Sequence, residues 1–127
     1  MDAWHVKVFG GAWALIGGLH LFAPRAPMGQ AFPAIEEGTA EYLRVKQTME
    51  ALGMAATAAG IVTITAAVTT PKESYATLCK GVLAASMVLT GGVFWHGSRP
   101  GYGNVPLQGK LTQLGFSILL AFGAFGK

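Results

Sequence analysis

The chain has 127 residues, of which 52% are hydrophobic and 12% are charged, about half the charged fraction of an average soluble domain. This composition excludes a disordered tail and a coiled coil, and the single cysteine, Cys79, excludes an internal disulfide framework. The formal net charge of +3 is spread as single Lys and Arg residues between apolar stretches, so it forms no basic stripe for a nucleic acid. We therefore expect an integral membrane protein, with membrane lipids and no nucleic acid as partners.

Four apolar stretches carry most of the mass, and each predicts a membrane-spanning helix. A hydrocarbon core of about 30 Å needs about 20 helical residues, and the stretches indicate spans at about 6–23, 50–69, 75–96 and 110–126. They lack both the polar stripe of a water-soluble helical bundle and the strict alternation of strands. The sequence predicts an all-α fold in which residues 1–127 form a single four-helix transmembrane domain.

The connections determine the expected topology. Residues 24–50 are first irregular and then helical, so the second helix is expected to project from the bilayer over about residues 40–68. Thr70 and Glu73 fit a capping box for the third helix, and residues 97–106 have the composition of a surface loop. Four spans place both termini on one side and the long first and third connections on the other. The basic residues divide four against five between these sides, which leaves the orientation open.

Small residues recur at helical spacing on the predicted spans. The pairs are Gly11 with Gly18, Ala56 with Gly60, and Gly81 with Ala85. In lipid, close backbone approach over glycine and alanine is a main source of helix association. We therefore expect these helix-packing faces to contact other helices, either in the chain's own bundle or in a larger membrane assembly.

Several ionisable or polar residues are expected at one leaflet. His20 ends the first span, Glu50 opens the second, His96 ends the third, and Lys110 and Gln113 open the fourth. Ionisable groups in a membrane are costly, so each is a candidate functional residue. The two imidazoles could ligate haem or chlorophyll or orient a quinone, with Glu50 as a proton shuttle. The alternative is that all of them are hydrated at the membrane interface.

The remaining motifs predict no catalytic or metal centre. The chain has no glycine-rich phosphate loop, no paired Cys or His spacing for a metal, and no nucleophile elbow. Cys79 is expected to be a small packing residue, and His5 beside Trp4 is expected at the membrane interface.

These observations predict a non-catalytic accessory subunit of a larger energy-transducing membrane complex, respiratory or photosynthetic. Two alternatives stay open: a membrane protein that binds haem, chlorophyll or quinone through His20 and His96, and a small homo-oligomeric transporter or channel lined by Thr57 and Thr63. The expected membrane is an organellar inner membrane, a thylakoid membrane or a bacterial inner membrane. In the order of its spans the chain resembles the small DoxX-type four-helix membrane proteins, a resemblance that implies the four-helix fold and no residue roles.

Overall fold

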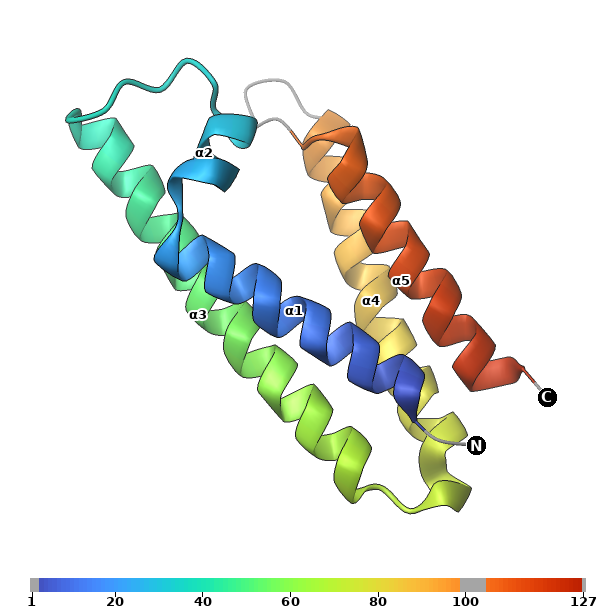
Figure 1. Ribbon diagram of the computed structural model, residues 1–127. Coiled ribbons are helices and arrows are strands. Elements are labelled where there is room, and N and C mark those ends of the chain that lie inside the picture. Colours follow the sequence, from blue (N-terminus) through green and yellow to red (C-terminus); the bar gives the residue numbers. More distant parts are fainter. Residues whose placement is uncertain (1–2, 99–104, 127) are drawn as a thin grey trace.

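The computed structural model describes residues 3–98 and 105–126, with the side chains of residues 96 and 97 left outside the description. Its elements in chain order are α1 (Trp4–Phe22), α2 (Arg25–Ala31), α3 (Ala40–Thr69), the 3-10 turn η1 (Lys72–Ser74), α4 (Tyr75–Ser98) and α5 (Leu107–Phe125) (Figure 1). These residues contain no strand. The all-α prediction is confirmed.

Local capping sets both ends of α3. Gly38 adopts a left-handed conformation, with φ of +82°, which glycine tolerates without steric cost. Thr39 follows as the N-cap, and its Oγ1 accepts a hydrogen bond from the Tyr42 N–H at 3.1 Å. At the other end, Thr70 Oγ1 donates to the carbonyl of Ala66 at 2.6 Å. The predicted capping box is therefore wrong, because the Thr70 hydroxyl bonds back to the helix it ends.

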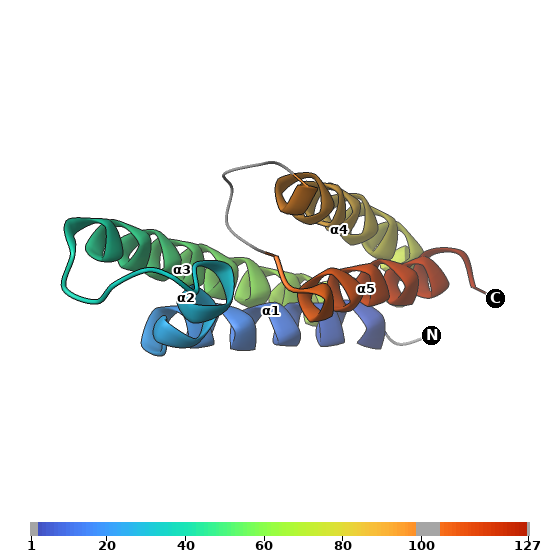
Figure 2. The same cartoon turned by 90° about the horizontal axis from the view of Figure 1, so that it is seen from above.

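The long helices form two antiparallel pairs, α1 with α3 and α4 with α5 (Figure 1). The pairs meet where α1 and α4 begin and where α3 and α5 end, and we call this the closed end. The buried apolar residues gather there: Ala3, Val6, Phe9, Ala67, Cys79, Leu120 and Ala124. An edge-to-face contact between Phe9 and Phe116, with centroids 5.6 Å apart, joins the pairs. From the closed end the two pairs diverge (Figures 1 and 2).

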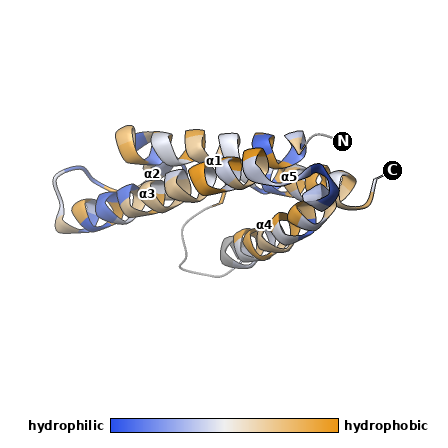
Figure 3. Cartoon of the chain, turned by 90° about the horizontal axis from the view of Figure 1, so that it is seen from below, coloured by the Kyte–Doolittle hydropathy of each residue, from blue (hydrophilic) through white to orange (hydrophobic). Residues whose placement is uncertain are grey.

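Within the described residues, two helices are long and apolar enough to cross a membrane, namely α3 and the stretch Lys72–Trp95. A third candidate is α1 taken together with α2, although the two are bent by 93° relative to each other. Only 17% of the most apolar α3 window and 11% of the second window are buried, so most of their apolar surface faces outward. Figure 3 shows hydrophilic residues along the connection into α3 and its first turns. The protein is thus consistent with integral membrane localisation.

The prediction of four spans is not confirmed by this test. Helix α5 has 19 residues, but Gln108, Lys110 and Gln113 lower the hydropathy of its first half. Helix α1, also of 19 residues, includes His5, Lys7 and His20 and qualifies only together with α2. Both helices lie close to where the sequence predicts spans, at 110–126 and 6–23.

Candidate functional site

The contact between α1 and α3 is made by four glycines, which we call the glycine interface: Gly10 and Gly17 on α1, and Gly53 and Gly60 on α3. A Cβ added to Gly17 would lie 2.5 Å from the backbone N of Thr57, and one added to Gly60 would lie 2.5 Å from the carbonyl O of Gly10. A Cβ on Gly53 would lie 2.7 Å from the carbonyl O of Gly17. The two backbones therefore approach so closely that no side chain fits between them.

The predicted helix-packing residues divide into two groups. Gly60 lies in the glycine interface, and Ala56 is half-buried on the same helix. In contrast, no atom of the described chain lies within 4 Å of a Cβ placed on Gly11, Gly18 or Gly81. Ala85, one turn after Gly81, is exposed. The chain's own helices therefore leave the Gly11–Gly18 and Gly81–Ala85 faces uncovered.

A chain of polar side chains that the sequence analysis did not single out as a unit joins α4 to α5. We call it the hydroxyl–amide cluster: Ser86 and Thr90 on α4, and Gln113 and Ser117 on α5. Gln113 Nε2 donates to Ser86 Oγ at 3.3 Å, and Ser86 Oγ lies 2.9 Å from Ser117 Oγ. Ser117 Oγ lies 3.0 Å from Thr90 Oγ1, which donates to the Ser86 carbonyl at 2.8 Å. The Thr90 hydroxyl uses its one hydrogen in the bond to that carbonyl, so Thr90 Oγ1 accepts from Ser117 Oγ. The Ser117 hydrogen is then used as well, so Ser117 Oγ accepts from Ser86 Oγ.

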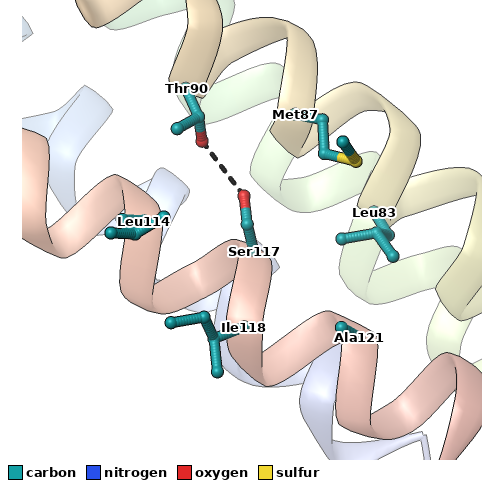
Figure 4. Close-up of a pocket in the computed structure, with 7 residues that line it drawn as sticks. All are labelled: Leu83, Met87, Thr90, Leu114, Ser117, Ile118 and Ala121. Atoms are coloured by element: carbon teal, nitrogen blue, oxygen red, sulfur yellow. Dashed lines mark hydrogen bonds between the residues drawn. The ribbon is translucent and has the colours of Figure 1, made fainter.

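This order uses each hydroxyl as one donor and one acceptor, so the cluster satisfies its own donors in an apolar setting. Ser86, Gln113 and Ser117 are buried. An open groove of about 320 Å³ runs beside it, lined by the Thr90 and Ser117 hydroxyls and by apolar side chains such as Met87 and Ile118 (Figure 4). The sequence pattern that reveals the cluster is a pair of polar residues four apart on each of two apolar helices.

Two cation–π contacts hold the ends of the α4–α5 pair. Lys80 Nζ lies 5.3 Å from the centroid of the Phe125 ring at the closed end. Lys110 Nζ lies 5.8 Å from the centroid of the Phe94 ring at the opposite end. Both pairs join α4 to α5, so each ammonium group faces an aromatic ring of the neighbouring helix.

The described members of the predicted one-leaflet group make the following contacts, and their gathering at one leaflet stays a prediction. His20 Nδ1 lies 2.8 Å from the carbonyl O of Ile16 in its own helix. Glu50 pairs with Lys46 one turn earlier, at 3.9 Å. Lys110 and Gln113 make the α4–α5 contacts given above. The side chain of His96 lies outside the described residues, so the proposed His20–His96 ligand pair stays a prediction.

The threonines of the channel hypothesis have different surroundings. Thr57 lies beside Gly17 in the contact with α1, and its hydroxyl is buried without a hydrogen-bond partner among the described residues. The Thr63 hydroxyl donates to the Ala59 carbonyl of its own helix at 2.7 Å. Thr57 therefore faces another helix of this chain, and a pore lined by both threonines stays a hypothesis without support from their placement.

His5 is buried against neighbouring helices, and its predicted depth at the membrane interface stays a prediction. Only 7% of its surface is exposed, and it lies at the closed end beside Cys79 and Gly123. Trp4 stacks on it with ring centroids 3.9 Å apart and is itself 46% exposed. The aromatic neighbour thus takes the outward position expected for both residues, because adjacent helical residues point about 100° apart.

Comparisons with protein-family models, curated proteins and solved structures find no match for this chain. Its function is therefore argued from its own geometry.

Proposed function

We propose that this chain is a non-catalytic accessory subunit of a larger membrane complex, in which the four long helices form four spans with both termini on one side. Membrane lipids and other membrane subunits are its partners. The complex is an energy-transducing one, respiratory or photosynthetic, in an organellar inner, thylakoid or bacterial inner membrane. The sequence supports the role of an accessory membrane subunit through its apolar spans and the long connections on one side.

The observation that carries the proposal is the uncovered small-residue face of α4. Gly81 and Ala85 are both exposed, and a Cβ on Gly81 meets no described atom within 4 Å. A glycine inside a helix lowers its stability by about 1 kcal/mol relative to alanine. The glycines of the glycine interface offset that cost through close contact with another helix, and Gly81 has no such contact with the described residues. A helix of a partner subunit is the surface that would compensate it.

The divergence of the two helix pairs supports the same proposal. The core of the described residues lies at the closed end, and the two pairs diverge from it. Away from this end, α4 exposes large apolar side chains such as Met87 and Val88. A partner that lies along α4 can use its small residues for close approach and its large ones for packing.

The experiment is native electrophoresis of the tagged full chain after solubilisation in a mild detergent. We expect the wild type to migrate with a much larger assembly, whose other subunits can then be identified. The double variant Gly81→Leu, Ala85→Leu should be released from it, because leucine side chains block close approach. Ala76→Leu makes the same kind of change at an exposed position of α4 that is turned about 140° from Gly81. It is the matched control and should stay associated.

Helix content by circular dichroism separates lost association from lost folding. Wild-type protein that migrates at its own mass, also after crosslinking in the intact membrane, contradicts the proposal. Equal release of the Ala76→Leu control would show that the small-residue face is not the contact.

A further inference from the structure

Two side chains with strong metal-binding chemistry are buried next to each other at the closed end. Cys79 on α4 is a free cysteine that exposes 1% of its surface. His5 on α1 exposes 7%, and its Nδ1 atom is buried with no hydrogen-bond partner among the described residues. A buried ring nitrogen without a partner is unfavourable, so the structure leaves this donor atom available for a ligand.

The two donor atoms converge on Gly123 of α5. A Cβ placed on Gly123 would lie 2.9 Å from Cys79 Sγ and 3.0 Å from His5 Nδ1. Sulfur and nitrogen ligands bind metals at about 2.0 to 2.3 Å, so one ion between them requires a separation of about 4 Å. Cys79 Sγ and His5 Nδ1 both lie within 3.0 Å of the Cβ position on Gly123, so small side-chain rotations bring them to this separation.

We propose that Cys79 and His5 bind one Cu(I) ion. The thiolate is a soft ligand and selects Cu(I), and imidazole binds copper as well. One thiolate neutralises one monovalent ion, so the occupied site has no net charge in its apolar surroundings. A divalent ion with the same two ligands would leave a net positive charge there, which is costly to bury.

The binding step balances without an oxidant or reductant. The Cys79 S–H bond breaks and its proton leaves to the buffer, while the thiolate sulfur forms a bond to copper. His5 is neutral with its proton on Nε2, and Nδ1 donates its lone pair to the metal. Copper remains Cu(I) throughout.

The surroundings fit a ligand pair shielded from water. Val6, Leu120 and Ala124 belong to the same buried cluster as Cys79. The Trp4 ring covers the outer side of His5. The two donors are held on separate helices, and Gly123 of α5 lies beside both. The ion would therefore fasten the two helix pairs together at the closed end.

The test uses the purified full chain in detergent under anaerobic conditions, with Cu(I) supplied as its acetonitrile complex and bicinchoninate as competitor. We expect one Cu(I) per wild-type chain. Cys79→Ser and His5→Gln should each weaken binding by at least about 100-fold, since even the loss of an outer partner of a metal ligand costs about 10- to 100-fold. His20→Gln is the matched control, because that histidine lies on the same helix and bonds its own backbone.

X-ray absorption on the wild type alone tests the site without any variant. One sulfur and one nitrogen ligand are expected, and a spectrum with only nitrogen or oxygen ligands overturns the proposal. Cu(I) that does not bind to natively folded wild type, or that binds Cys79→Ser with unchanged affinity, overturns it as well. Zn(II) that displaces Cu(I) at equal concentration would refute the charge argument. The copper experiment measures metal binding by the purified chain, and the native gel measures association with other subunits. The copper proposal and the subunit proposal can therefore fail separately.

Discussion

The two helix pairs are held together by different chemistry. In the α1–α3 pair the backbones touch through the glycine interface, and its stability depends on the absence of four side chains. In the α4–α5 pair the contacts are side-chain hydrogen bonds in the middle and cation–π contacts at the ends. The first pair therefore tolerates no addition at its contacts, whereas the second can lose one interaction and keep the others.

The sharpest way to test this difference is to add one methyl group to the glycine interface. Gly17→Ala places a Cβ 2.5 Å from backbone N of Thr57, where neither helix can yield without moving apart. We expect a loss of about 1 to 3 kcal/mol in the free energy of unfolding, measured by denaturant titration in detergent micelles. Gly18→Ala, the next residue, is the matched control and should be near neutral or slightly stabilising. Equal losses in both variants would contradict the proposed contact.

A smaller loss is expected from the hydroxyl–amide cluster. Ser117→Ala removes the hydroxyl between Ser86 and Thr90, so both lose a partner. Hydrogen bonds between membrane helices contribute about 0.6 kcal/mol each on average, so the loss of both bonds predicts a destabilisation of about 1 kcal/mol.

A double-mutant cycle of Ser117→Ala with Ser86→Ala measures the interaction energy between the two hydroxyls. Additive losses would refute a connected hydrogen-bond network. Thr112→Ala is the control on α5, because that exposed hydroxyl bonds only its own helix, to Gln108, in the contacts described. Its substitution should have little effect on the α4–α5 pair.

The helices could be predicted from the sequence with good accuracy, and the contacts between them only in part. Apolar stretches and polar connections locate the long helices, and α3, Ala40–Thr69, lies close to the predicted 40–68. The connection predicted to be irregular after residue 24 holds the short helix α2, Arg25–Ala31. The doublets Gly10–Gly11 and Gly17–Gly18 are visible in the sequence, but which member faces a neighbour depends on helix rotation. Adjacent residues differ by about 100°, and only the position of α3 selects Gly10 and Gly17.

The burial of His5 could not be predicted for a related reason. Its position near the chain terminus favours the interface, but α4 and α5 happen to cover this side of α1 and leave Trp4 outside. Such coverage depends on contacts between residues more than 70 positions apart, such as His5 with Cys79 and Gly123. A local sequence pattern carries no information on these contacts.

The smallest effect is expected at the ends of the α4–α5 pair. Lys80→Met keeps an unbranched side chain only one atom shorter and removes the charge over the Phe125 ring. An exposed cation–π contact contributes about 0.5 to 1 kcal/mol, and we expect a loss of that size, with Lys72→Met on η1 as control. A double-mutant cycle of Lys80→Met with Phe125→Leu measures the coupling energy between the two side chains. Phe125→Leu should cost less stability in the Lys80→Met background, because the contact is already lost there. A loss as large as that of Gly17→Ala would mean that the ends, and not the hydroxyl–amide cluster, hold α4 to α5.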